Sequence, residues 1–163
     1  SGHAPRGRTE TDMVRLVERT AEDMRALAED KGQVLSLDLK GPGVLRVDEA
    51  TVRLALVNLL DNAIKYTPHS GAITVGSRIR GDEFLIEVTD TGPGIPAEHR
   101  DRIFDRFYRI ETDRSSLAGG AGLGLSIAKW AVEANGGRIE LEIGERPGTT
   151  FRLVFPMDRS NSR

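Results

Sequence analysis

The sequence has no cysteine among its 163 residues and few aromatic side chains, at 5%. The absence of cysteine excludes disulfide bonds, thiolate nucleophiles and metal sites with sulfur ligands. No apolar run approaches the roughly 20 residues that cross a membrane, and no signal peptide is visible. The net charge of only −2 gives no support for binding to nucleic acid or to a membrane surface.

What is present fits one globular domain with a single core, since 38% of the residues are hydrophobic and 29% are charged. The opening Ser1, Gly2 and His3 resemble the remnant of a cleaved tag, so we expect a fragment of a longer protein. We predict a tag remnant and linker over residues 1–11, a domain over 12–157 and a tail over 158–163.

Hydrophobic periodicity predicts three helices, at 12–31, 49–66 and 123–135. Asp12 and Asp48 are suited to cap the first two helices, and Gly32 to end the first. Alternating apolar and polar residues predict strands at 34–39, 45–47, 73–79, 84–88, 139–143 and 151–155. A sheet of such strands is covered on a single side, which favours antiparallel pairing. The predicted fold class is therefore an α/β (α+β) two-layer sandwich, with three helices on one face of a mainly antiparallel sheet.

Polar residues form a narrow row on the helix predicted at 49–66. Asn58, Asn62 and Lys65 stand at i, i+4 and i+7. The opposite, broad apolar side consists of Ala55, Leu56, Val57, Leu59, Leu60, Ala63 and Ile64. A polar row usually faces solvent, but Asn is a poorer helix former than the Glu, Lys and Arg of ordinary solvent faces. Two Asn one turn apart therefore indicate a need for amide oxygens, which Mg²⁺ accepts together with phosphate, and Lys65 stands within reach of such a phosphate.

Asp90 follows the strand predicted at 84–88 with the same parity as Ile86 and Val88. It is therefore expected to face the layer between sheet and helices, where a lone carboxylate is costly without a partner. The turn at 91–96 contains glycines that let backbone approach a ligand, although an ordinary surface turn has the same composition. The turn also matches the dinucleotide pattern G-x-G-x-x-A, but no glycine-opened helix and following parallel strand accompany it.

A second glycine-rich segment, 119–125, opens directly into the last predicted helix. Unpaired N–H groups at a helix start suit phosphate, whereas a hinge would use the same glycines. The P-loop pattern G-x-x-x-x-G-K-[ST] is absent from the sequence. Between the two glycine segments, Phe104 and Phe107 stand at i and i+3, and we expect both to pack into the core.

Five segments then stand in order along the chain: NLLDNAIKY, DTGPGI, IFDRFYR, GGAGLGL and PGTTF. Together they closely resemble the ATP-binding catalytic domain of bacterial sensor histidine kinases, in the superfamily shared with gyrase, Hsp90 and MutL. A single glycine-rich segment would be weak evidence for the family. Here all five segments stand in the order of the family and span residues 54 to 151. The resemblance implies the Bergerat fold, with a mixed sheet of about five strands.

The resemblance implies roles at the phosphate end of an ATP site. Asn62 takes the position of the Mg²⁺ ligand, and Asn58 that of its supporting partner. Lys65 resembles the phosphate-contacting lysine. Arg109 resembles the arginine that reaches the terminal phosphate, with Arg102 and Arg106 as weaker candidates on the same segment.

At the adenine end, Asp90 resembles the aspartate that hydrogen-bonds the adenine amino group. The residues that resemble the surrounding pocket are Tyr66, Gly92, Gly94, Ile95 and Thr149. In the glycine segment, the residues that resemble the phosphate-covering lid and its hinges are Gly120, Gly122, Leu123, Gly124 and Leu125. ATP and Mg²⁺ are the implied cofactors.

One position separates this sequence from the ATPases of the superfamily. Those proteins and the anti-sigma-factor serine kinases carry Glu four residues before the metal-binding Asn, whereas this chain has Asn58, which cannot act as a general base. The resemblance therefore implies a domain that holds ATP and passes its γ-phosphoryl group to a histidine elsewhere. His3, His69 and His99 do not fit the family's acceptor pattern, so we expect no autophosphorylation of this chain alone.

The implied partners are the phosphoacceptor domain of a homodimeric kinase and a cognate response regulator, with no nucleic acid. The implied location is cytoplasmic, as part of a membrane-anchored bacterial sensor. A regulatory nucleotide-binding module without transfer activity is the alternative that remains open.

Overall fold

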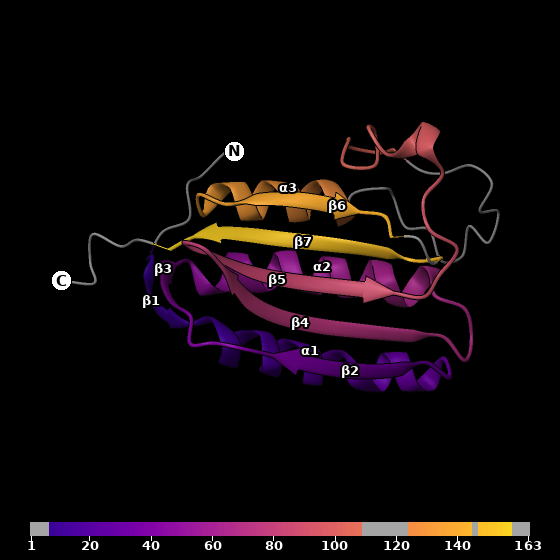
Figure 1. The fold of residues 1–163 in the computed structure, drawn as a ribbon, viewed down its shortest axis with the longest axis horizontal. Coiled ribbons are helices and arrows are strands. Elements are labelled where there is room, and N and C mark those ends of the chain that lie inside the picture. The colour runs from indigo at the N-terminus through magenta and orange to yellow at the C-terminus, as the bar shows by residue number, and fades with distance from the viewer. Residues whose placement is uncertain (1–6, 109–123, 145–146, 158–163) are drawn as a thin grey trace.

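The computed structural model describes residues 7–108, 124–144 and 147–157, which form two layers (Figure 1). The helices are α1 (Met13–Asp30), α2 (Glu49–Tyr66), α3 (Gly124–Ala134) and the short 3-10 helix η1 (Ala97–His99). The strands are β1 (Thr9–Asp12), β2 (Val34–Leu39), β3 (Val44–Val47), β4 (Ala72–Arg80), β5 (Glu83–Asp90), β6 (Arg138–Glu142) and β7 (Thr149–Pro156).

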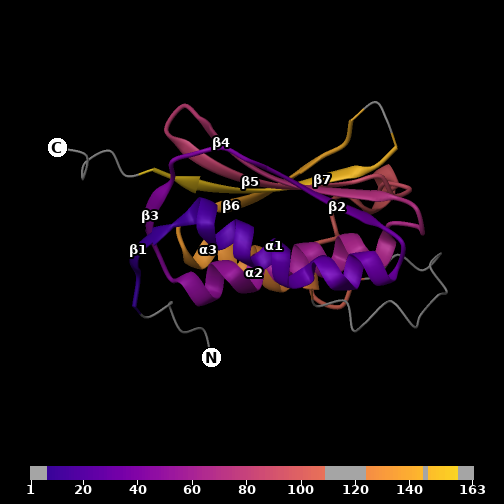
Figure 2. The same cartoon turned by 90° about the horizontal axis from the view of Figure 1, so that it is seen from below.

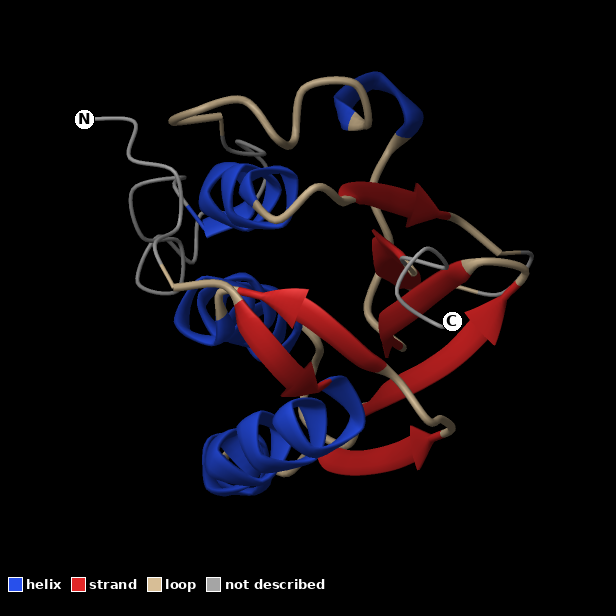
Figure 3. Cartoon of the chain, turned by 90° about the vertical axis from the view of Figure 1, so that its left-hand side faces the viewer, coloured by secondary structure: helices blue, strands red, loops and turns tan. Residues whose placement is uncertain are grey.

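The main sheet has five strands in the order β2-β4-β5-β7-β6. β2 and β4 are parallel, and the other neighbouring strands are antiparallel. The α-helices lie together on one face of this sheet (Figure 2), and the view along the strands shows these helices on one side and the main sheet on the other (Figure 3). The predicted two-layer sandwich with a mixed, mainly antiparallel sheet is confirmed.

The predicted helix starts are confirmed by their caps. The Asp12 carboxylate accepts a hydrogen bond from the Arg15 N–H at 3.1 Å, and Asp48 accepts one from the Thr51 N–H at 3.0 Å. A cap of this kind contributes about 1 kcal/mol. α2 packs against both α1 and α3, so the apolar side of α2 is buried from two directions.

Thr9–Asp12 is a strand, not the linker that the sequence indicated. β1 pairs antiparallel with β3 in a separate two-stranded sheet, so the strand predicted at 45–47 also lies outside the main sheet. Only Thr11 of β1 is buried, and for this reason the strand carries no apolar alternation. The Arg8 guanidinium adds a 2.8 Å hydrogen bond to the Ala134 carbonyl at the end of α3.

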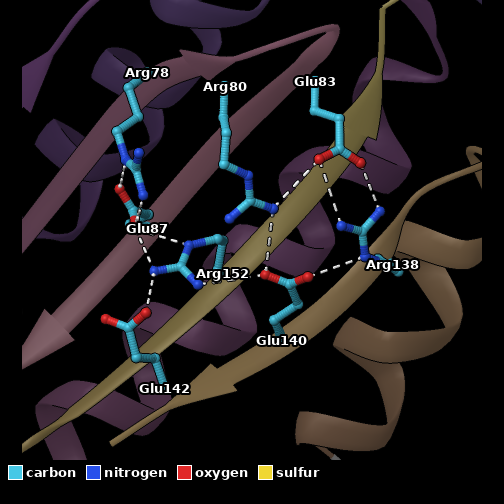
Figure 4. A network of polar contacts seen from close by, with 8 residues as sticks. All are labelled: Arg78, Arg80, Glu83, Glu87, Arg138, Glu140, Glu142 and Arg152. Carbon is cyan, nitrogen blue, oxygen red and sulfur yellow. Dashed lines mark hydrogen bonds and ion pairs between the residues drawn. The ribbon is translucent and has the colours of Figure 1, made fainter. Parts of the chain in front are cut away.

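The sheet face away from the helices is closed by ion pairs (Figure 4). At their centre Arg152 on β7 is only 5% exposed, and its guanidinium contacts the carboxylates of Glu87 at 2.7 Å, Glu140 at 3.3 Å and Glu142 at 3.0 Å. The network is completed by Arg78, Arg80, Glu83 and Arg138. Leu85 and Val154 share this face and are fully buried. We name these eight charged residues the sheet-face network.

None of the described helices is both long and apolar enough to span a membrane.

Candidate functional site

The polar row of α2 lies at the edge of the core with all three members partly exposed. The Asn58 amide donates to the Leu54 carbonyl at 2.9 Å, and its oxygen points toward the first turn of α3, 3.7 Å from the position of a Cβ on Gly124. Lys65 forms an ion pair with Asp61 one turn earlier, with 3.1 Å between Nζ and Oδ2. The Asn58 end of the row therefore faces the start of α3, and the row continues along α2 through Asn62 to Lys65.

Asp90 ends β5 and is buried, as its parity predicts. Its Oδ1 accepts a hydrogen bond from the Gly92 N–H at 2.8 Å, and the Thr149 backbone donates a second bond to the carboxylate. Burial raises the pKa of Asp90, and these two N–H donors oppose that effect only in part. A carboxylate has about four lone-pair sites, so it retains the capacity to accept a hydrogen bond from a ligand.

Backbone surrounds Asp90 so closely that side chains would not fit. A Cβ on Gly92 would lie 3.0 Å from Asp90 Oδ1 and 3.0 Å from the Tyr66 carbonyl. A Cβ on Gly148 would lie 2.2 Å from the Asp90 carbonyl oxygen. Gly148 also has a φ of +131°, a backbone conformation that glycine adopts more readily than other residues. The end of α2, the turn after β5 and the start of β7 therefore pack closely around Asp90, and we name this arrangement its backbone cradle.

The described residues bring most of the predicted adenine-side residues to this cradle. Tyr66 is 37% exposed and Thr149 is buried. Gly94, with φ of +80°, approaches Gly148, and the neighbouring Ile95 packs against the core. At the α3 end, Gly124 and Leu125 form the first turn of the helix. The predicted residues Arg109, Gly120, Gly122 and Leu123 lie outside the described residues.

Residues 47–159 match the family model of histidine kinase-, DNA gyrase B- and HSP90-like ATPases. The chain belongs to this family. The match covers all five segments on which the sequence resemblance was based, from the polar row of α2 to the start of β7.

Individual relatives narrow the family to histidine kinases. The signal transduction histidine-protein kinase ArlS of Staphylococcus aureus (strain USA300) is 48% identical over 96 residues, which make up 59% of this chain and 21% of ArlS. A structure of the mycobacterial sensor histidine kinase MprB is 30% identical, with a TM-score of 0.78 over 92% of this chain and 97% of that one. Full-length ShkA in complex with AMPPNP is 31% identical, with a TM-score of 0.77 over 92% of this chain and 31% of that one.

The chain is thus an ATP-binding catalytic domain of the histidine-kinase type, and it spans about a fifth of the length of ArlS. Nucleotide binding follows from membership of the family.

In this histidine-kinase domain, the segment between the two glycine regions departs from the sequence prediction. Phe104 packs edge-on against Phe151, with ring centroids 5.9 Å apart, as expected for a core residue. Phe107, however, is 62% exposed and has a φ of +64°. The i, i+3 spacing does not place both rings on one face because the helical part of the segment is the single turn η1.

The same segment contains a contact that the sequence analysis missed. The His99 Nδ1 and the Tyr108 hydroxyl form a hydrogen bond, and the Arg102 guanidinium lies 4.7 Å from the centroid of the Tyr108 ring. These contacts hold Tyr108, the last described residue before Arg109. No spacing rule signals a pair nine residues apart in irregular structure.

Two further residues were missed at the end of α2. Lys31 and Gln33, in the turn after α1, donate hydrogen bonds to carbonyls in the last turn of α2 and at its C-cap residue Thr67. The sequence showed only that α1 ends near Gly32. Neither residue type nor spacing indicated a contact with a helix more than 30 residues later.

Proposed function

We propose that this domain binds Mg-ATP and donates its γ-phosphoryl group to a histidine on a separate dimerisation domain. The observation that carries the proposal is the buried Asp90 in its backbone cradle beside the last residue of α2, the helix whose C-terminal half carries the polar row of Asn58, Asn62 and Lys65. ShkA was solved with AMPPNP, an analogue of ATP, and this chain shares its fold over 92% of its length.

In the proposed complex, Asp90 accepts a hydrogen bond from the exocyclic amine of adenine. Gly92, Gly94 and Ile95 shape the pocket from one side, and Tyr66 and Thr149 contact the base from the others. The raised pKa of Asp90, caused by its burial, makes this contact sensitive to acid, because a protonated carboxyl is a poorer acceptor. A base without an amino group at that position would leave the remaining acceptor site of the carboxylate without a donor.

At the other end, Asn62 contributes an amide oxygen to Mg²⁺, and Asn58 holds that amide row in place. A bound Mg²⁺ would supply positive charge beside the phosphates, against the negative charge that develops as the phosphoryl group leaves. Lys65 and Arg109 bind the phosphates as cations, while Gly120, Gly122, Leu123, Gly124 and Leu125 cover them. Lys65 must exchange its ion pair with Asp61 for phosphate, at little cost because both side chains are partly exposed.

The transfer itself breaks the bond between the γ-phosphorus and the β,γ-bridging oxygen and forms a bond to a histidine nitrogen of the acceptor domain. ADP leaves with the electron pair of the broken bond. Asn58 cannot accept a proton from water, so hydrolysis remains slow and the phosphoryl group is kept for the histidine. We further propose a homodimeric full-length sensor, anchored in a membrane with this domain in the cytoplasm, whose cognate response regulator receives the phosphoryl group.

The test mixes this chain with a separately produced dimerisation hairpin from the full-length protein, in the presence of Mg²⁺ and ATP labelled at the γ-position. We expect label on the hairpin histidine and none on this chain alone. Labelling of this chain alone would contradict the prediction that it contains no phosphoacceptor histidine. Nucleotide binding with an unlabelled hairpin would instead favour the regulatory module.

Variants separate the two ends of the site. Asp90→Asn is expected to weaken ATP binding at least about tenfold by calorimetry, because it replaces the acceptor for the adenine amine. The matched control Asp38→Asn changes an exposed aspartate on β2 and should leave the affinity unchanged. Asn62→Ala should abolish the effect of Mg²⁺ on affinity, with an unchanged circular dichroism spectrum. Unaltered ATP affinity in Asp90→Asn would remove the adenine assignment.

A further inference from the structure

The last turn of α2 is held by the turn that follows α1. α1 and α2 lie side by side under the sheet (Figure 2), and residues 31–33 come directly after α1. The Lys31 ammonium donates to the carbonyls of Ile64 and Lys65, both at 2.7 Å. The Gln33 amide donates to the carbonyls of Ile64 at 2.9 Å and Thr67 at 2.6 Å. We name Lys31 and Gln33 the α2 clamp.

The chemistry of the clamp matches a helix C-terminus. The last four carbonyls of an α-helix lack partners within the helix and carry the negative end of its dipole. Lys31 brings a positive charge to that end and makes charge-assisted hydrogen bonds, which are stronger than neutral ones. Gln33 is buried, and because two carbonyls face its side chain, only the NH₂ group of the amide can point toward them.

The turn is also fixed from the other side, so that the clamp has a rigid base. The Ser70 N–H donates to the Gly32 carbonyl at 3.0 Å, and the Val34 N–H donates to the Gly71 carbonyl at 3.0 Å. The turn after α1 and the loop after α2 are therefore joined through both backbone and side chains. Movement at one of them displaces the other.

We propose that Lys31 and Gln33 are positioning residues of the nucleotide site, which hold the last turn of α2 so that Asn62, Lys65 and Tyr66 point at the magnesium-bound phosphates and the base. The clamp touches neither metal nor nucleotide, and acts only through the carbonyls of Ile64, Lys65 and Thr67. Its role rests on the proposed Mg-ATP site, because Asn62 and Lys65 are the side chains that it aligns. Geometry of this kind matters because a misplacement of about 1 Å can cost about 100-fold in rate.

A purely structural clamp and a positioning clamp differ in one measurable quantity. Asn62 contributes only to the Mg²⁺-dependent part of nucleotide affinity, whereas Asp90 on β5 contributes with or without the metal ion. The ratio of ADP affinity with Mg²⁺ to ADP affinity in a chelator therefore isolates the contribution of Asn62, whereas Lys65 and Tyr66 contribute to both affinities. A variant that only loses stability keeps both its ADP affinity with Mg²⁺ and its ADP affinity in chelator, as long as the protein remains folded.

The test measures this ratio by calorimetry for the whole chain and for Lys31→Met, at a temperature where both are folded. We expect Lys31→Met to reduce the Mg²⁺-dependent ratio about fivefold to tenfold. The affinity in chelator should fall by a smaller factor, because Lys65 and Tyr66 are displaced as well. Lys31→Arg, which keeps the charge and several donors, should restore most of the ratio. The matched control is Lys40→Met, at an exposed lysine whose described hydrogen bonds involve only its backbone.

If Lys31→Met gave the same ratio as Lys40→Met, the positioning role would be overturned, whatever its effect on stability. Should Lys31→Met fail to fold, Lys31→Gln keeps a donor without the charge and carries the same comparison. Failure of the proposed function is a separate result, since the unsubstituted chain would then show no Mg²⁺-dependent affinity at all.

Discussion

Removing the buried arginine of the sheet-face network should cost far more stability than removing an exposed one. Arg152 has a side chain that is 6% exposed and contacts three carboxylates, those of Glu87, Glu140 and Glu142. Arg152→Met keeps the aliphatic volume but leaves these carboxylates without their shared cation. Breaking a buried ion pair by removing one partner costs about 3–5 kcal/mol.

The cost here should fall below that range because the carboxylates are not equally buried. The Glu142 side chain is 60% exposed and regains water, whereas that of Glu87 is 19% exposed. We therefore expect Arg152→Met to lower the free energy of unfolding by about 2–3 kcal/mol at neutral pH, which for a domain of this size lowers Tm by about 4–12 °C. Arg80→Met, with a side chain 41% exposed, should cost less than about 1 kcal/mol.

The penalty should also depend on pH. Burial alone would raise the pKa of Glu87, but hydrogen bonds from Arg78 and Arg152 outweigh it, so that the pKa lies below the ordinary value. The pKa of Glu140 is lowered in the same way, by Arg138 and Arg152 against the effect of burial. A carboxylate with a lowered pKa in the folded state adds stability that is present above the unfolded pKa, about 4.3, and is lost as pH falls through the folded value.

The assay is urea unfolding of the unsubstituted chain, Arg152→Met and Arg80→Met at about pH 7 and about pH 4. We expect the gap between the unsubstituted chain and Arg152→Met to narrow at the lower pH. Equal losses in both arginine variants would refute the reasoning. A gap that stays constant with pH would also refute it, because the lost interaction would then not involve ionised glutamates.

Two further predictions concern the site itself. Asp61→Asn removes the carboxylate that pairs with Lys65, so ATP affinity at low salt should rise about twofold by calorimetry, and a fall would show that Asp61 takes part in binding. Gly148→Ala places a Cβ 2.2 Å from the Asp90 carbonyl at a φ of +131°, so the free energy of unfolding should fall by about 2 kcal/mol or more. Gly144→Ala, where a Cβ meets nothing within 4 Å, is its matched control and should leave urea unfolding unchanged.

The parts of the fold that the sequence could predict are those built from local patterns. The apolar side and the polar row of α2 follow from the period of a helix, and the position of Asp90 on the helix-facing side of β5 follows from the period of a strand. Both predictions hold in the structure. Caps at Asp12 and Asp48 are local as well, since each side chain bonds a backbone N–H three residues later. Such signals need no knowledge of which elements become neighbours.

The parts that could not be predicted depend on neighbours that are distant in sequence. Arg152 alternates with apolar residues and is expected to face solvent, yet glutamates from β5 and β6 cover it. β1 has one buried side chain and is recognised only by its pairing with β3. The α2 clamp joins residues more than 30 positions apart in the sequence. Phe107 points outward because the segment around it is not helical.

The two faces of the main sheet are linked through the register of β5 and β7. Glu87 lies opposite Arg152, and three residues further along β5 Asp90 lies opposite Thr149. A slip of one residue would move every side chain of a strand to the other face, so that Asp90 would leave its cradle and the buried cation would face the apolar layer. Such a slip would be unfavourable on both faces. On the helix side it would remove Phe84 and its buried neighbours from the core, and on the other side it would break the Glu87–Arg152 ion pair. The sheet-face network therefore contributes to the site without contacting it, since it helps to fix the one register in which the carboxylate of β5 points toward α2.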